Sequence, residues 1–244
     1  MRSAFGASIL AYWNGNSSAY RIIERDDGHK EKMLVEYLFA DKSKWSLAEI
    51  SALQNIPPRS RILDVGCGAG RVALQLQEDR HEVVGLDSCR EAIEVAKGRG
   101  LRYTHLADVC NLKAPPVFDE FDAILMMGNN FGICGDIFTT ERLLERLSTF
   151  LVSNGLLIFS CRDPLMTDNP VHLDYHQKNR EKGRPPGLVR IRIAHEELTD
   201  DWWDLLFVSK ITAIKMLGRT GFEEISSYQD DSPVYYVVAK KKGG

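Results

Sequence analysis

The residues best suited to chemistry lie in one short stretch, Arg61-Ile-Leu-Asp-Val-Gly-Cys-Gly-Ala-Gly-Arg71. Residues 62–65 are mostly apolar, which predicts a buried parallel strand, and apolar residues at helical spacing in 72–76 predict a helix after it. Between the two, Gly66, Gly68 and Gly70 allow a tight turn and leave no Cβ in the way of a ligand. A strand, a glycine turn and a helix N-terminus together present backbone N–H groups to a bound molecule.

The glycine spacing distinguishes two kinds of nucleotide-like ligand. The dinucleotide fingerprint is G-x-G-x-x-G, whereas this chain has G-x-G-x-G with Arg71 where the last glycine would stand. Asp64 also lies two residues before the first glycine. A carboxylate there repels a pyrophosphate and attracts an ammonium group. The stretch therefore disfavours a nicotinamide oxidoreductase and favours a cationic ligand.

Two more carboxylates follow apolar segments. Asp87 ends the segment 82–87, 23 residues after Asp64 (87 minus 64), which is about one strand–helix–strand step. An acidic residue at such a strand end can accept hydrogen bonds from both hydroxyls of a ribose, although it can also be a simple turn former. Asp108 follows the segment 101–106 and, taken alone, would cap a short turn.

With these residues in place, the chain resembles the class I S-adenosylmethionine-dependent methyltransferases, whose first motif is D/E-x-G-x-G-x-G. Asp64, Gly66, Gly68 and Gly70 match this motif position by position. The resemblance implies a doubly wound α/β fold with a seven-stranded, mostly parallel sheet, and S-adenosylmethionine as the cofactor. It also implies that the glycines lie under the methionyl and ribose parts, Asp64 near the amino group, Asp87 on the ribose and Asp108 on the exocyclic amine of adenine. The full set of expected cofactor-binding residues is Asp64, Gly66, Cys67, Gly68, Gly70, Arg71, Asp87, Ser88, Asp108, Val109, Met127 and Gly128.

Four further residues are weaker candidates for catalysis. Asn129 and Asn130 follow the apolar segment 121–127 in a Gly-Asn-Asn-Phe stretch that is similar to the G-N-S-F stretch of small-molecule N-methyltransferases of the glycine/sarcosine type. We expect them to hold the acceptor or the methionyl end of the cofactor, or to cap the following helix. His172 and His176 lie four apart and could act as a general base. Solvated loop histidines are the default interpretation of this pair, and we expect no metal.

The strand and helix pattern places these residues on a parallel sheet. Five apolar segments (62–65, 82–87, 101–106, 121–127 and 156–160) alternate with helical ones. We expect a helical N-terminal cap in 1–59, the Rossmann-like core in 60–161, an insertion in 162–208, and a helix with closing antiparallel strands in 209–244. Within the insertion, 162–187 is expected to be a mobile loop and 188–208 a β-hairpin over the acceptor site. In the N-terminal cap, Tyr12, Tyr20 and Arg21 are candidates to contact substrate, although ordinary packing is an equal alternative. The lysine-rich tail 240–244 is expected to be disordered.

Composition limits the partners and the location. The net charge of −3 argues against a general nucleic-acid-binding surface. Five scattered cysteines without a C-x-x-C pair are typical of reduced thiols in the cytoplasm. The apolar run 4–11 is shorter than the roughly 20 residues that span a bilayer. A local basic cluster could steer an anionic substrate or touch RNA, although such runs are more often solvated surface: Lys178, Arg180, Lys182, Arg184, Arg190 and Arg192.

Methyl transfer from S-adenosylmethionine to a small-molecule acceptor is the function that these features favour. One alternative is an RNA or protein methyltransferase that docks its substrate on the basic insertion, and another is a non-catalytic S-adenosylmethionine-binding protein. We expect no nucleic-acid partner and no membrane association, and a homodimer is left open. The sequence does not identify the acceptor or the atom that is methylated, whether N, O, C or S.

Overall fold

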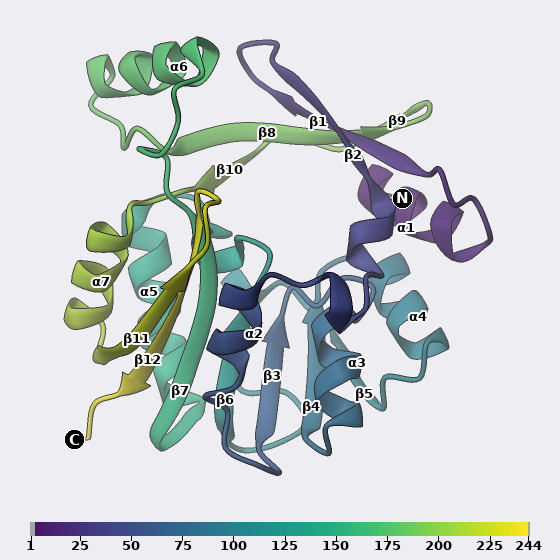
Figure 1. Ribbon diagram of the computed structural model, residues 1–244, viewed down its shortest axis with the longest axis vertical. Helices are drawn as coiled ribbons and strands as arrows, with labels where there is room; N and C mark the ends of the chain where they lie inside the picture. Colours follow the sequence, from purple (N-terminus) through teal and green to yellow (C-terminus); the bar gives the residue numbers. More distant parts are fainter. Residues whose placement is uncertain (1–2, 244) are drawn as a thin grey trace.

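The computed structural model describes residues 3–243 and contains two β-sheets, one above the other (Figure 1). The larger, which we call the core sheet, has seven strands in the order β11-β12-β7-β6-β3-β4-β5. In chain order these are β3 (Arg61–Val65), β4 (Glu82–Asp87), β5 (Tyr103–Leu106), β6 (Phe121–Met126), β7 (Leu151–Arg162), β11 (Phe222–Gln229) and β12 (Val234–Lys241). Strands β3 to β7 run parallel, whereas β12 runs antiparallel to both of its neighbours. This topology confirms the predicted doubly wound, mostly parallel, seven-stranded sheet.

Helices cover both faces of the core sheet. They are α2 (Leu47–Leu53), α3 (Arg71–Glu78), α4 (Arg90–Gly98), α5 (Ile137–Thr149) and α7 (Lys210–Arg219). Adjacent residues of β3 enter opposite clusters: Leu63 packs with side chains of α5 and α7, and Ile62 packs with side chains of α2 and α3. Because both faces are buried, these strands are continuous apolar runs, which is why the sequence pattern located them.

The second sheet, which we call the roof sheet, is antiparallel and lies over the carboxyl ends of the core strands (Figure 1). Its strand order is β10-β8-β1-β2, and the short β9 pairs with β8. The strands are β1 (Tyr20–Arg25), β2 (Lys30–Leu34), β8 (Leu188–His195), β9 (Leu198–Thr199) and β10 (Trp203–Leu206). Ile23 of β1 pairs with Ile193 of β8. The N-terminal segment and the distant insertion therefore form one structure rather than two.

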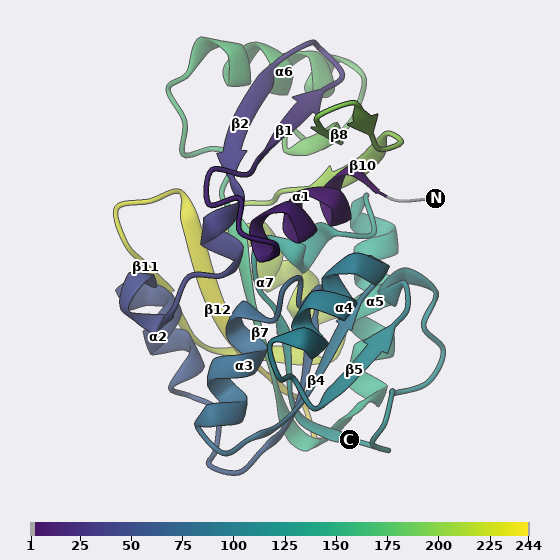
Figure 2. The same cartoon turned by 90° about the vertical axis from the view of Figure 1, so that its right-hand side faces the viewer.

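Two helices support the roof sheet. Helix α1 (Ala4–Trp13) packs against β8 and against α4 of the core, below the hairpin β1–β2 (Figure 2). Helix α6 (Pro170–Glu181) packs at the other end, where Tyr175 joins Val189 and Ile191 in an apolar cluster. The roof is thereby fixed to the core at one end and stiffened by a helix at the other.

The sequence predicted a helical N-terminal cap in 1–59. The structure differs, because residues 20–34 contain the hairpin β1–β2. Its turn holds Asp26-Asp27-Gly28, and Gly28 has a φ of +87°, which favours glycine. Lys32–Leu34 belong to β2, and the 3₁₀ helix η1 follows at Val35–Leu38. The local sequence pattern predicted a helix wrongly because β1 pairs with β8, which lies far along the chain. Tertiary pairing here overrides local propensity.

The expected mobile loop 162–187 contains α6 instead. Asn169 caps this helix, with its side chain accepting a hydrogen bond from the N–H of Val171 at 3.0 Å. Pro170 is its first residue, where a missing N–H does no harm. Pro170 thus starts a helix within the segment that was expected to be a loop.

Two smaller differences concern the C-terminal end of the chain and the start of strand β7. Lys240 and Lys241 belong to β12 rather than to a disordered tail, and Gly244 lies outside the described residues. Strand β7 begins at Leu151 rather than at residue 156. Within residues 3–243, every helix is too short or too polar to cross a bilayer.

Candidate active site

A cavity of about 1140 Å³ lies between the carboxyl ends of the core strands and the roof sheet. One side is formed by residues at the ends of β4 and β5, and the other by apolar residues of the roof sheet and α1. The predicted site residues in its wall are Gly66, Asp87, Ser88, Asp108, Val109 and Asn130. The remaining predicted site residues lie behind the wall or elsewhere: Asp64, Cys67, Gly68, Gly70, Arg71, Met127, Gly128, Asn129, His172 and His176.

The glycine turn between β3 and α3 is closed by backbone geometry that favours glycine. Gly66, Gly68 and Gly70 all have positive φ, at +73°, +55° and +82°. At Gly66 a Cβ would also stand 2.2 Å from Nδ2 of Asn130. This amide donates hydrogen bonds to the carbonyls of Val65 (3.0 Å) and Gly66 (3.3 Å). The turn is thus held from above by the loop that follows β6.

Asp87, at the end of β4, ties the glycine turn to the neighbouring strand. Its Oδ2 accepts from the N–H of Gly68 and its Oδ1 from the N–H of Cys89, both at 2.8 Å. Burial raises the pKa of Asp87, and these backbone hydrogen bonds oppose the increase. Each carboxylate oxygen has further lone pairs, so the residue can accept hydroxyl hydrogen bonds from a ligand while it fixes the turn.

Asp64 and Arg71 occupy a layer beneath the turn. Asp64 is only 3% exposed, and burial raises its pKa to about 7, although the Arg71 charge opposes this. Arg71 forms a bidentate pair with Glu49 of α2, at 2.5 and 3.2 Å, and lies over the ring of Trp45. In this structure the arginine stabilises the contact between α2 and α3, and the contact of Asp64 with a cofactor amino group stays a prediction.

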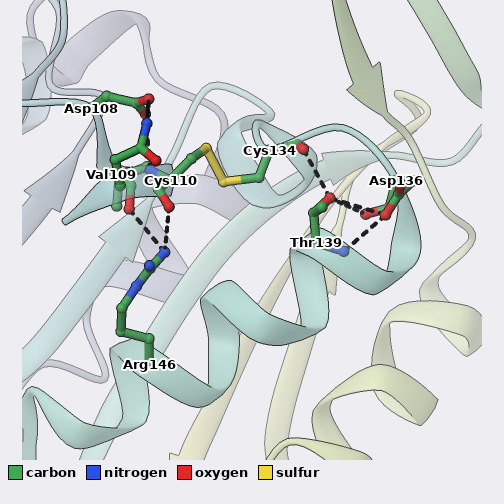
Figure 3. The surroundings of a disulfide bond; sticks show 8 residues. Asp108, Val109, Cys110, Cys134, Asp136, Thr139 and Arg146 are labelled. Carbon is green, nitrogen blue, oxygen red and sulfur yellow. Dashed lines mark hydrogen bonds between the residues drawn. A yellow bond between two sulfur atoms is a disulfide. The ribbon is translucent and has the colours of Figure 1, made fainter. Parts of the chain in front are cut away.

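The far end of the cavity is built around Asp108. Its Oδ1 accepts from the N–H of Cys110 and its Oδ2 from the side chain of Asn111, which starts the 3₁₀ helix η3 (Val109–Asn111). Arg146 of α5 donates to the carbonyls of Val109 (3.1 Å) and Cys110 (2.9 Å), as Figure 3 shows. Asp108 thus has the turn-capping role, and its place in the wall also leaves it accessible to a ligand.

A disulfide joins this end of the cavity to the loop after β6. Cys110 and Cys134 are bonded, with their Cα atoms 5.7 Å apart (Figure 3). The expectation of five reduced thiols is therefore wrong for this pair, whereas Cys67, Cys89 and Cys161 are free. The two cysteines are 24 residues apart in sequence, and the fold brings them together because both follow carboxyl ends of core strands.

The two asparagines after β6 have different surroundings. Asn130 lies in the cavity wall and holds the glycine turn. Asn129 has a φ of +69°, and its backbone N–H donates to Oγ of Ser160 at 3.1 Å. Asn129 does not cap the 3₁₀ helix η4 (Asn130–Gly132) with its side chain. The sequence analysis offered two roles, contact with a ligand and capping of the next helix. Asn130 is positioned for the first, because it lies in the cavity wall.

The apolar side of the cavity comes from residues that the sequence did not single out. Phe5 of α1, Ile193 of β8, and Trp203 and Leu205 of β10 all line it. Asp200 also lines it and accepts hydrogen bonds from the backbone N–H groups of Ala4 and Phe5, which fixes the start of α1. The sequence could have indicated Trp203 as a wall residue, because it is an aromatic residue within the predicted hairpin. No sequence pattern around Phe5 indicated that it lines a cavity.

The histidine pair of α6 lies outside the cavity wall. His172 accepts through Nδ1 a hydrogen bond from Arg25 at 3.0 Å, and its ring packs edge-on against His29. Burial lowers the pKa of both His172 and His176, and neighbouring arginines lower it further. Within the described part of the chain, no three His, Cys, Asp or Glu side chains gather in a way suited to a metal ion.

Comparison with known proteins shows what part of this chain is similar to a known family. Residues 62–155 match the model of a family described as a methyltransferase domain. A curated Geobacillus sp. (strain WCH70) protein, named as a methyltransferase, is 26% identical over 47% of this chain, and the match spans about half (51%) of that relative.

Two solved structures share the fold. A Bacteroides fragilis S-adenosylmethionine-dependent methyltransferase, solved with S-adenosylhomocysteine, has a TM-score of 0.80 at 23% identity over 99% of this chain and 96% of its own. An amino pentose methyltransferase from Micromonospora echinaspora has a TM-score of 0.57 at 16% identity over 82% and 93% of the two chains. These matches agree with the predicted enzyme class and with S-adenosylmethionine as the predicted cofactor. Residues 62–155 therefore match a methyltransferase domain, and the chain as a whole has the fold of S-adenosylmethionine-dependent methyltransferases.

Proposed function

We propose that the protein transfers a methyl group from S-adenosylmethionine to a small-molecule acceptor held beneath the roof sheet. The observation that carries this proposal is the cavity of about 1140 Å³, whose wall combines the carboxylates of the core strand ends with the apolar roof residues. Pockets for one drug-sized ligand are about 300–1,000 Å³, so this cavity suits a cofactor together with an acceptor.

Roles for the wall residues follow from their chemistry. Asp87 accepts hydrogen bonds from the ribose hydroxyls, and Asp108 with Val109 receives the adenine edge. Gly66 and Asn130 would hold the methionyl end, and the methyl group would then face the roof side of the cavity. Phe5, Trp203 and Leu205 then pack against the acceptor from above.

The chemistry asks little of individual side chains. The cofactor supplies a methyl group on a sulfonium, which is already activated for displacement. The protein has to hold the acceptor lone pair in line with this methyl at about 3–3.5 Å and keep water out. A general base is needed only where the acceptor must lose a proton, and no histidine stands among the described wall residues.

The position of the cavity beneath the roof sheet favours a small acceptor over a macromolecule. The basic residues of the insertion are partly neutralised: Arg192 pairs with Glu24 at 2.9 Å, and Arg190 pairs with Asp204 at 3.2 Å. A docking surface for RNA would leave such charges free for phosphates. Because one structural neighbour is an amino pentose methyltransferase, amino sugars are the first acceptor class to test.

Calorimetric titration with S-adenosylmethionine and S-adenosylhomocysteine tests the cofactor half of the proposal. We expect both to bind, and Asp87→Asn to weaken binding about tenfold or more because hydrogen bonds to a charged acceptor are lost. Asp201→Asn, at an exposed position outside the wall, is the matched control. Wild-type protein that binds neither compound would overturn the proposal.

Isotope-labelled S-adenosylmethionine tests the acceptor half. We expect label to enter small molecules of a metabolite extract, with amino sugars assayed separately. Label that enters only RNA or protein, at a rate that falls when Arg190 and Arg192 are neutralised, would favour the macromolecular alternative. Tight cofactor binding without any transfer would favour a non-catalytic binding protein.

A further inference from the structure

Arg21 of β1 is a buried cation without a counter-charge. Arg21 is 5% exposed. Among the described residues, its Nε and Nη1 have no hydrogen-bond partner and its guanidinium forms no ion pair. Only Nη2 is engaged, as a donor to the hydroxyl of Tyr37. An unpaired buried charge is costly, by several kcal/mol, and the protein retains this one.

Arg25, on the same strand, shows how this chain satisfies a buried arginine in other places. It is 6% exposed and forms an ion pair with Asp27 at 2.7 Å. It also donates to the carbonyl of Val171 and to the ring of His172. Two arginines of nearly equal burial therefore differ in their partners: among the described residues, Arg25 has an anion and Arg21 has none.

The position of Arg21 is fixed by two aromatic rings. Its Cζ lies 5.1 Å from the ring centroid of Phe5 and 5.2 Å from that of Tyr37. Stacking of this kind orients the planar guanidinium without using its N–H groups. The side chain is thus held in place while its buried donors on Nε and Nη1 stay unpaired.

Arg21 lies behind the cavity wall, next to residues that form it. Phe5, which contacts Arg21, forms part of the cavity wall, and so does Ile193. Ile193 pairs with Ile23, and Arg21 is two residues from Ile23 on β1, so Arg21 and Ile193 share one face of the roof sheet. Phe5 also packs in one apolar cluster with Ala69 of the glycine turn. Arg21 is therefore near the end of the cavity where the methionyl group and the acceptor meet.

The charges of the wall indicate what kind of anion fits. Arg90 is the one basic residue among the described wall residues, whereas the acidic ones are Asp87, Glu91, Glu94, Asp108 and Asp200. A dianionic phosphate would meet strong repulsion there with a single guanidinium to offset it. A carboxylate carries one charge and matches the planar donor arrangement of arginine.

We propose that Arg21 binds a carboxylate of a molecule held in the cavity. This rests on the proposed function, because the two sources of that carboxylate are the methionyl end of S-adenosylmethionine and a carboxylate-bearing acceptor. The shared chemistry is a monoanionic, planar group that enters between Phe5 and the glycine turn and completes the ion pair.

The test compares two nucleosides in wild-type protein and in Arg21→Met, which keeps the side-chain volume and removes the charge. S-Adenosylhomocysteine has the methionyl-type carboxylate, and 5′-methylthioadenosine lacks it. If the cofactor supplies the carboxylate, Arg21→Met weakens S-adenosylhomocysteine about tenfold or more and leaves 5′-methylthioadenosine unchanged. If the acceptor supplies it, neither affinity changes, and label from S-adenosylmethionine no longer enters the acidic fraction of a metabolite extract.

Stability measurements separate this role from a structural one. Removal of an unpaired buried charge should leave the melting temperature of Arg21→Met unchanged or raise it. The control Arg25→Met breaks an ion pair and should lower the melting temperature while leaving the ratio of the two nucleoside affinities unchanged. An Arg21→Met variant that binds both nucleosides and labels every fraction as the wild type does would overturn the inference, while the proposed function would survive. A variant that loses stability and both nucleosides equally would also overturn it, and wild-type protein that binds neither nucleoside would overturn both proposals.

Discussion

The core sheet and the roof sheet enclose the same cavity but are built in different ways. The parallel core strands are buried on both faces, and the turn that follows β3 is fixed by glycines with positive φ and by the carboxylate of Asp87. The roof strands come from two distant segments, and the face that bears Glu24 and Arg192 is held by an ion pair. The core is therefore the floor of the cavity, built around the glycine turn, and the roof is a second sheet, assembled from two distant segments, that covers it.

Because the two sheets differ in this way, we expect substitutions in them to have different effects on cofactor affinity and on turnover. Changes in the core should impair cofactor binding and, through it, everything else. Changes in the roof at positions other than Arg21 should leave cofactor affinity nearly intact and alter turnover. The following predictions test this division, beginning with the largest expected effect.

Gly66→Ala should have the greatest effect. A Cβ at this position would stand 2.2 Å from Nδ2 of Asn130, and the φ of +73° is unfavourable for alanine. We expect cofactor affinity to fall by about 100-fold or more, since the turn must shift away from the ligand.

Gly68→Ala is the matched control for this change. Its φ is also positive, at +55°, but a Cβ there meets nothing within 4 Å. We expect a loss of about 1–2 kcal/mol of folding free energy in chemical denaturation, and a smaller loss of affinity. Equal effects of the two substitutions in titration with S-adenosylhomocysteine would contradict the steric explanation.

Reduction of the Cys110–Cys134 disulfide should have the next largest effect. The bond closes a loop of 24 residues, for which loop entropy predicts a stabilisation of about 3–4 kcal/mol. It also joins the segment that bears Asp108 to the loop that bears Asn130, so reduction should weaken adenosine binding.

Denaturation with and without dithiothreitol measures this contribution. The double variant Cys110→Ser/Cys134→Ser should resemble the reduced wild type and should not respond to dithiothreitol. A response of that variant would show that the reductant acts on another thiol.

Trp203→Ala should produce the pattern expected of the roof. Trp203 lines the cavity on the side opposite Asp87 and Asp108, so we expect affinity for S-adenosylhomocysteine to stay within about twofold of wild type. Loss of its packing against the acceptor should lower kcat/KM about tenfold. A large loss of S-adenosylhomocysteine affinity would contradict the division between floor and roof.

The two sheets also differ in how far the sequence revealed them. Asp87 could be placed at a strand end because β4 is a continuous apolar run, and such runs are local signals. The hairpin β1–β2 could not be located in the same way, since its neighbour β8 lies far along the chain. Phe5 and Trp203 became wall residues only through the packing of α1 and the roof over the core. The bond between Cys110 and Cys134 likewise depends on topology rather than on sequence spacing.

The last prediction concerns the pH dependence of stability that arises from the acid beneath the floor. Burial raises the pKa of Asp64 from 3.8 to about 7, so the folded protein binds more protons than the unfolded chain between about pH 4 and pH 7. By linkage, the contribution of Asp64 to the free energy of unfolding falls as pH rises through this window and is lowest above pH 7. Asp64→Asn removes this dependence, because an amide is neutral at every pH in the range. In urea denaturation we therefore expect Asp64→Asn to gain stability relative to wild type at pH 7.5 compared with pH 5. The opposite sign would mean that Arg71 holds this carboxylate ionised, and the layer under the glycine turn would then contain a charged pair rather than a buried neutral acid.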